Sequence, residues 1–237
     1  MNLKTKIILF IQLLLCYHIL WGQSIKKTLA RQFIIPVVIV GYGLTTFYGN
    51  GYPSSYDVKN YRDQHFANFK TQVDDILPVA PVALTYGLDL LGIKCKSDFT
   101  NRSVIFAKAA LLSITCVNIM KYTSNVMRPD STALNSFPSG HTAFTFAMAT
   151  VMHQELKSRS IWWSVLGFSC ATGVGALRIL NNRHWFTDVI VGAGIGIASG
   201  QIASATHQYK WNRYLLRAQI IPVFFNNGYG IAFNKKF

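Results

Sequence analysis

Apolar runs separated by short polar stretches make up most of the chain between residues 33 and 205. Six such segments stand out: Phe33–Gly49, Leu77–Ile93, Val104–Met120, Thr142–His153, Ile161–Leu177 and Val189–Ala205. Most of them are close to the length of about 17 residues that a helix needs to cross a bilayer. Several contain Gly, Ser or Thr, and one contains Lys108, so each is a weaker candidate than an ordinary membrane span. The pattern predicts an all-α, membrane-associated protein.

Small residues recur at every fourth position in the last of these segments, at Gly192, Gly196 and Gly200. This spacing places them on one face of a helix, where small side chains let a neighbouring helix approach closely. A dinucleotide-binding glycine loop does not fit, because no strand precedes these residues and their spacing differs from that motif. We therefore expect close helix packing at this face.

The two ends of the chain differ from the helical region. Residues 1–22 combine two lysines with an apolar stretch and a small residue, the order of a signal peptide, and an uncleaved N-terminal anchor is the alternative. Residues 207–237 form a basic tail in which Asn226–Gly228 lie between two β-favouring runs, which predicts a hairpin. Between them we expect a helical domain over residues 23–206. Its polar segment Asn50–Asp75 is expected as an external loop or an interfacial helix.

The composition narrows the class of protein. Of the 237 residues, 51% are hydrophobic and 14% are charged, well below the charged fraction of about 25% in ordinary globular domains. The 23 Lys and Arg residues outnumber nine Asp and Glu, which gives a net charge of +14. These cations form no dense cluster, so we expect no nucleic acid partner. An anionic membrane surface and a phosphorylated substrate account for the charge.

Lys and Arg gather in three of the loops: Lys94–Arg102, Lys157–Arg159 and Lys210–Arg217. Cytoplasmic loops are enriched in these residues, so the three loops are expected on the cytoplasmic side of a membrane. The loops Lys121–Pro138 and Arg178–Asp188 then share the external side. The basic residues between positions 26 and 31 would also be cytoplasmic, which conflicts with a signal cleaved just before them. The path of the first two apolar segments therefore stays open.

The two external loops carry most of the unusual polar residues, in three short stretches: Lys121–Pro129, Phe137–Thr142 and Leu177–Asp188. The residues Pro138–Gly140 begin a helix, where unpaired N–H groups and the positive end of the helix dipole attract an anion. Lys121, Arg128 and Arg178 add three cations from the same face. Together, the helix start and the cations would bind a doubly charged phosphate.

Two histidines supply the reactive groups. His184 and Asp188 are four residues apart at a helix start, close enough for the carboxylate to accept a proton from one imidazole nitrogen. That pairing leaves the other nitrogen free to attack phosphorus, and a second histidine, His141, can protonate the leaving oxygen. The residues fit phosphoryl transfer through a phosphohistidine, with cations offsetting the transition-state charge.

The pattern K-x6-R-P, P-S-G-H and R-x5-H-x3-D resembles the signature of the type 2 phosphatidic-acid-phosphatase superfamily. That superfamily includes membrane lipid phosphatases, soluble bacterial acid phosphatases and vanadium haloperoxidases. The resemblance implies a helical bundle in which His184 is the nucleophile, Asp188 orients it and His141 is the general acid. It also implies a set of phosphate-binding residues: Lys121, Arg128, Ser139, Gly140 and Arg178.

The resemblance covers about Leu77–Ala205 and implies neither a cofactor nor a metal. The sequence departs from the family pattern at one position. Leu177 stands where the third motif commonly has Ser, which removes a hydrogen bond to phosphate. This departure leaves the details of the substrate open more than it affects the reaction.

We therefore expect a metal-independent phosphatase acting on a membrane lipid phosphate or diphosphate: polyprenyl diphosphate, a phosphatidate-type lipid or lipid A. Its site is expected on the external, periplasmic face of the cell membrane. The signal-like N-terminus and the short apolar segments favour an alternative, a soluble periplasmic acid phosphatase for small phosphomonoesters. Vanadium haloperoxidase chemistry and lipid-phosphate binding without turnover are weaker alternatives. The expected partners are the lipid substrate and the membrane, with no obligate protein partner implied.

Overall fold

The computed structural model describes residues 27–207, 218–225 and 228–235. Each of the six apolar segments overlaps one long helix, and these are α2 (Lys27–Thr45), α5 (Ala80–Leu90), α6 (Phe99–Ser124), α7 (Gly140–Leu156), α8 (Ile161–Leu180) and α9 (Phe186–Ala205). The predicted helical fold is therefore confirmed. Three of these helices, α6, α8 and α9, are long and apolar enough to cross a membrane.

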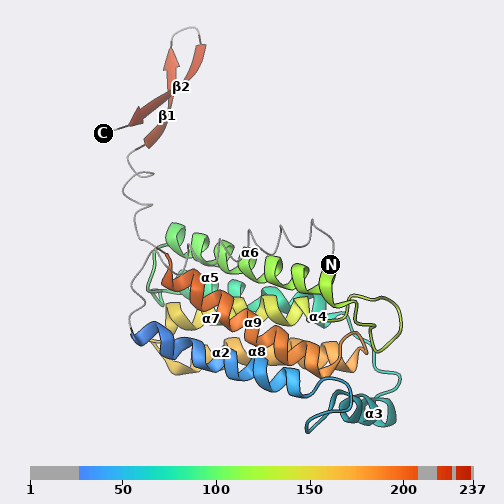
Figure 1. The fold of residues 1–237 in the computed structure, drawn as a ribbon. Helices are drawn as coiled ribbons and strands as arrows, with labels where there is room; N and C mark the ends of the chain where they lie inside the picture. Colours follow the sequence, from blue (N-terminus) through green and yellow to red (C-terminus); the bar gives the residue numbers. More distant parts are fainter. Residues whose placement is uncertain (1–26, 208–217, 226–227, 236–237) are drawn as a thin grey trace, which may run out of the picture.

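Helix α9 occupies the centre of the bundle. It packs against α2, α6 and α7, while α7 also packs against α8 (Figure 1). Of the three long apolar helices, α9 is the most buried. Because α7 and α9 are in close contact, the residues at their N-terminal ends are held next to each other.

The glycine face of α9 explains how closely α7 approaches. A Cβ atom at Gly192 would lie 2.7 Å from the Ser139 carbonyl oxygen, and one at Gly196 would overlap the Ala143 carbonyl oxygen. The packing expected from the spacing of these glycines is thus confirmed, because the two backbones meet where no side chain fits. The contact continues as a hydrogen bond of 3.0 Å from Ser139 N to the Asp188 carbonyl oxygen.

An apolar cluster lies directly beneath this junction. Its buried members are Val117, Phe137, Ala143, Val191 and Ile195. They come from α6, from the loop before α7, from α7 itself and from α9. Burial of these side chains joins the last turns of α6 to the first turns of α7 and α9.

Three short elements cover the same end of the bundle. Helix α3 (Ser55–His65) begins with a capping box between Ser54 and Asp57, and α4 (Val73–Ile76) and the 3-10 helix η1 (Leu77–Val79) lead into α5. The segment Asn50–Asp75 therefore contains a helix. A hydrogen bond of 3.0 Å from Arg62 Nε to the Leu180 carbonyl oxygen ties α3 to the end of α8.

Four of the five loops grouped by charge lie in the described residues, and they sort to the two ends of the bundle as predicted; the loop Lys210–Arg217 lies outside the described residues. At one end, Trp185 Nε1 donates to the Met127 carbonyl oxygen at 2.7 Å, so the loops before α7 and before α9 touch. At the other end, Arg159 Nε donates to the Lys94 carbonyl oxygen at 2.9 Å. Which end faces the cell exterior stays a prediction.

The described part of the basic tail forms two antiparallel strands, β1 (Ala218–Phe225) and β2 (Gly228–Lys235). Ala218 pairs with Lys235 and Phe225 with Gly228. The expected signal peptide or anchor, residues 1–22, lies outside the described residues. The domain boundaries at residues 22 and 206 stay predictions.

Candidate active site

His184 and Asp188 lie side by side at the start of α9. Their side chains are only 3% and 1% exposed, and His184 Nδ1 is 3.4 Å from Asp188 Oδ2. This separation is longer than the distance of about 3.0 Å in an ordinary N–H···O bond. Among the described residues, no other group pairs with His184 Nδ1. The carboxylate is therefore the one neighbour that can orient this imidazole.

Helix capping and a loop serine hold Asp188 in place. Asp188 occupies the third position of α9, where its Oδ2 accepts a hydrogen bond of 2.9 Å from Trp185 N. A negative side chain in the first turn of a helix is favoured by the free N–H groups and by the helix dipole. Ser136 Oγ donates to the same carboxylate oxygen at 2.5 Å. The carboxylate is thus fixed before any substrate arrives.

His141 is the second residue of α7 and is partly exposed. Its Nε2 lies 3.2 Å from Asp75 Oδ1, on the short helix α4. The neighbouring Ser139 is fully buried, and its hydroxyl pairs with the Thr142 hydroxyl at 2.9 Å. Ser139 therefore holds the start of α7 against α9, while Gly140 lines a groove next to His141.

The three cations of the motifs meet protein acceptors at this same end. Lys121 Nζ donates to the carbonyl oxygens of Asn135 and, at 3.3 Å, Ser136. Arg128 Nε donates to the Asn135 side-chain oxygen at 2.9 Å. Backbone and side-chain oxygens of the loop before α7 therefore accept hydrogen bonds from both cations.

Arg178 is held by two adjacent carboxylates of α4. Its Nη1 lies 2.7 Å from Asp74 Oδ2 and 3.3 Å from Asp75 Oδ1. Asp74 is 1% exposed and also accepts a hydrogen bond of 2.8 Å from Asn181 Nδ2. A buried guanidinium needs such a partner, because an unpaired buried charge is strongly unfavourable.

The chain can now be compared with known proteins. Residues 102–212 match the family model described as the PAP2 superfamily. The chain contains a PAP2 superfamily domain. The resemblance to the type 2 phosphatidic-acid-phosphatase superfamily is confirmed, and the matched range includes every residue of the three motifs.

Two known proteins are similar to this chain. A lipid A 1-phosphatase from Porphyromonas gingivalis is 40% identical over 187 residues, which cover 78% of this chain and 39% of that protein. The chain therefore spans well under half the length of this relative. The crystal structure of Aquifex aeolicus LpxE has 22% sequence identity and a TM-score of 0.47, and the match covers 62% of this chain and 93% of that one.

Burial controls the protonation of His184 in the PAP2 domain. Removal from water lowers the pKa of this imidazole to about 4, whereas the Asp188 carboxylate opposes the shift. The positive charges of Lys121 and Arg178 lower the same pKa further. The imidazole is therefore neutral at pH 7, the form that can act as a nucleophile.

Two cavities of different chemistry lie near the motif residues. One, of about 410 Å³, contains Lys121, Gly140 and His141, and its other walls are mostly apolar: Pro78, Val79, Ile114, Val117 and Phe144. The other, of about 710 Å³, is lined by charged and amide side chains that include Arg178, Arg183 and Asn181. Asp75 lines both cavities and therefore lies between them.

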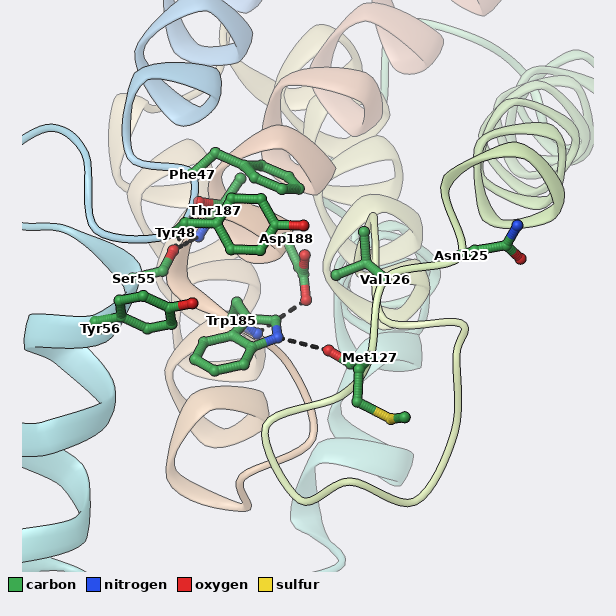
Figure 2. A pocket seen from close by; sticks show the side chains of 10 residues that line it. All are labelled: Phe47, Tyr48, Ser55, Tyr56, Asn125, Val126, Met127, Trp185, Thr187 and Asp188. Carbon is green, nitrogen blue, oxygen red and sulfur yellow. Dashed lines mark hydrogen bonds between the residues drawn. The ribbon is translucent and has the colours of Figure 1, made fainter.

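A third cavity, of about 310 Å³, reaches the other side of the Asp188 carboxylate (Figure 2). Its walls include Tyr48, Tyr56 and Trp185, and His184 is not among its lining residues. Figure 2 shows Trp185 between Asp188 and Met127, with its backbone N–H directed to Asp188 and its indole N–H to Met127. The cavity thus borders the group that orients His184, not the imidazole itself.

Reasoning from sequence missed three residues of this site: Ser136, Asp74 and Asp75. The two aspartates form an acidic pair in a strongly basic chain, at the end of a segment expected on the external side. The acidic pair at that position could therefore have indicated that these residues belong to the site. Ser136 has no such signal, because a serine in a loop rich in Ser and Asn does not stand out.

The described residues supply positive charge to this site through Lys and Arg side chains. Within the same part of the chain, no three His, Cys, Asp or Glu side chains gather as the ligands of a metal ion would.

Proposed function

We propose that this chain is a phosphatase of the PAP2 type that removes phosphate from a membrane lipid. The supporting observation is the apolar groove that contains His141 and Lys121. Its walls include exposed apolar side chains of α6 and η1, such as Ile114 and Val79. A lipid tail can lie along these side chains while its phosphate reaches the cations.

The reaction proceeds in two steps through His184. The lone pair of His184 Nε2, the nitrogen that does not face Asp188, attacks phosphorus and forms a P–N bond. The bond from phosphorus to the lipid oxygen breaks, and that oxygen takes a proton from protonated His141. Water then attacks phosphorus and gives its proton to His141, the P–N bond breaks, and inorganic phosphate leaves.

The cations stabilise the charge that builds on the phosphoryl oxygens. Lys121 and Arg128 would exchange their present protein acceptors for these oxygens. Arg178 would exchange Asp75 for them while it keeps its contact with Asp74. The N–H group of Gly140 at the start of α7 contributes to the same anion site, whereas the Ser139 N–H donates to the Asp188 carbonyl oxygen and holds this helix start in place. Fixed positive groups in a largely buried site stabilise such charge more strongly than water does.

Among the three candidate lipids, similarity to a lipid A 1-phosphatase favours lipid A as the substrate. The relative from Porphyromonas gingivalis is a lipid A 1-phosphatase, and it is 40% identical over the aligned 187 residues. A polyprenyl diphosphate and a phosphatidate-type lipid are the alternatives to be compared with it. The three helices long enough to span a bilayer favour a membrane enzyme over the soluble acid phosphatase.

The proposed orientation places the site on the external face of the membrane. Support comes from the basic loops Lys94–Arg102 and Lys157–Arg159, which meet at the opposite end of the bundle. Lys and Arg in short loops favour the cytoplasmic side. Hydrolysis of a lipid phosphate presented only to the outer leaflet would support this orientation.

The decisive experiment compares His184→Ala with wild type in detergent, using lipid A, a polyprenyl diphosphate and phosphatidate as substrates. His65→Ala is the matched control, because His65 is an exposed histidine at the end of α3. We expect phosphate release by wild type and His65→Ala, with and without chelator, and none by His184→Ala. Undiminished release by His184→Ala would refute the mechanism, and loss of wild-type activity with chelator would refute metal independence.

A further inference from the structure

Asp75 occupies a position that an anionic substrate would need. One of its carboxylate oxygens, Oδ1, lies 3.2 Å from His141 Nε2 and 3.3 Å from Arg178 Nη1. In the proposed reaction these two groups contact the phosphate, one at the leaving oxygen and one at a phosphoryl oxygen. An anion of the protein itself therefore bridges the two groups that would receive the substrate.

The carboxylate and a phosphate exclude each other at this position. Both are anions, and two like charges a few ångströms apart in a partly buried site repel strongly. His141 and Arg178 can also direct only a limited number of N–H groups toward one point. Substrate binding therefore requires Asp75 to leave.

The neighbouring Asp74 is held in a different way. Asp74 is 1% exposed and has two strong contacts, to Arg178 at 2.7 Å and to Asn181 at 2.8 Å. Asp75 is 59% exposed, its contacts are longer, and it lies between the two cavities. Rotation of the Asp75 side chain into water would release its contacts while Asp74 keeps Arg178 in place.

We infer that Asp75 sets the affinity of the phosphate position by competing with the substrate for Arg178 and His141. This inference rests on the proposed function of the site. A molecule whose Asp75 is in place does not bind phosphate, so the apparent affinity falls in proportion to the open fraction. Removal of this carboxylate raises the affinity for phosphate.

The experiment titrates inorganic phosphate into the purified full chain in detergent and measures heat. Its variants are Asp75→Asn, which keeps the shape, and Asp75→Ala, which also removes the acceptor. Asp130→Asn is the control, because Asp130 lines the larger cavity and pairs with Arg183, not with Arg178 or His141. All variants are also made in the His184→Ala background, where binding is measured without turnover.

We expect both Asp75 variants to bind phosphate about tenfold more tightly than wild type. This gain corresponds to Asp75 contacting His141 and Arg178 in about nine of ten wild-type molecules. Asp130→Asn should change the affinity by less than about twofold, because the partner of Asp130 is Arg183, whose side chain is 45% exposed and screened by water. Equal effects of Asp75→Asn and Asp130→Asn would overturn the inference, since they would reflect net charge alone. Weaker or absent phosphate binding by the Asp75 variants would also overturn it, because Asp75 would then organise the site.

The two proposals fail in different ways. Tighter phosphate binding by the Asp75 variants without hydrolysis of any lipid would uphold the competition and refute the phosphatase activity. Hydrolysis that depends on His184, with no gain of phosphate affinity in either Asp75 variant, would uphold the activity and refute the competition.

Discussion

Ser136 donates a hydrogen bond of 2.5 Å to Asp188 Oδ2, the same oxygen that lies 3.4 Å from His184 Nδ1. Ser136 precedes α7 and Asp188 is in the first turn of α9, so this bond links the two helix starts that carry the proposed catalytic histidines. The Trp185 backbone N–H completes the set of donors to this oxygen. The orientation of His184 therefore depends on a loop residue outside the three motifs.

Replacement of Ser136 by Ala should lower kcat with little change in KM. A hydrogen bond to a charged group contributes about 1.5–3 kcal/mol, which corresponds to about a ten- to a hundredfold effect if it acts in the transition state. Steady-state kinetics on a lipid phosphate provides the measurement. Ser131→Ala, in the same loop and exposed, is the control and should keep wild-type kinetics. An unchanged kcat in Ser136→Ala would show that Trp185 alone suffices to hold Asp188.

Replacement of Asp74 by Asn should destabilise the fold and weaken phosphate binding. Loss of one partner from a buried ion pair leaves an uncompensated charge, which costs about 3–5 kcal/mol. Thermal unfolding in detergent and phosphate titration provide the measurements. Lys59→Gln breaks the surface pair of Lys59 with Asp63, whose side chains are 26% and 41% exposed, and should change stability by less than about 1 kcal/mol. Equal melting temperatures for the two variants would contradict the structural role of Asp74.

His184 should make stability depend on pH between 6.5 and 4. Its pKa is lowered from 6.5 to about 4 in the folded chain, chiefly by burial. In this window the unfolded chain binds more protons than the folded chain, so the contribution of His184 is complete above pH 6.5 and declines as the pH falls toward 4. The difference in unfolding free energy between wild type and His184→Gln, measured from pH 7 to pH 4, isolates this slope. A pH-independent difference would show that the ring is solvated.

The same pKa predicts where the acid limb of activity lies. The proposed nucleophile is lost only when His184 takes up a proton, so kcat/KM should fall as the pH drops through about 4, not through 6.5. A pH profile of kcat/KM tests this. Ser136→Ala should shift this limb, because it removes a donor to the carboxylate that faces His184. An acid limb near 6.5 in wild type would refute a buried, neutral His184 as the group responsible.

The apolar groove should distinguish lipid from small soluble substrates. Ile114→Ala removes part of its wall and should raise KM for a lipid phosphate by about three- to tenfold, through lost apolar contact. KM for p-nitrophenyl phosphate, which has no lipid tail, should not change. Leu111→Ala alters an exposed leucine of the same helix that does not line the groove, and serves as control. Equal effects of Ile114→Ala on KM for both substrates would show that the lipid tail does not bind in this groove.

The packing of α7 on α9 should be sensitive to a single methyl group. A Cβ atom at Gly196 would overlap the Ala143 carbonyl oxygen, so Gly196→Ala should push the helices apart and cost about 1–3 kcal/mol. Gly87→Ala, in α5, adds a methyl group where no atom lies within 4 Å, and should not destabilise the fold. Melting temperatures and kcat provide the measurements. If Gly196→Ala matched Gly87→Ala in both, close helix contact would not be what positions the histidines.

The sequence by itself determined the helices and the motif residues. Apolar segments define the long helices because burial or lipid contact is encoded locally, in runs and periods of side chains. Charge in the loops predicted which loops share an end, and for the four of these loops that the structure describes, the contacts of Trp185 with Met127 and of Arg159 with Lys94 bear out that grouping. The glycine spacing in α9 likewise predicted a close neighbour, although it did not identify that neighbour as α7.

Only the tertiary structure decided which polar groups meet. Asp75 and Arg178 are 103 positions apart in sequence, and Ser136 and Asp188 are 52 apart. No local pattern encodes such pairs, because each depends on the distance and rotation between packed helices. The burial of His184, which lowers its pKa, is likewise a property of its surroundings, not of the residue. The sequence thus identified the groups suited to phosphate chemistry, and the packing determined which carboxylates hold them in the absence of substrate.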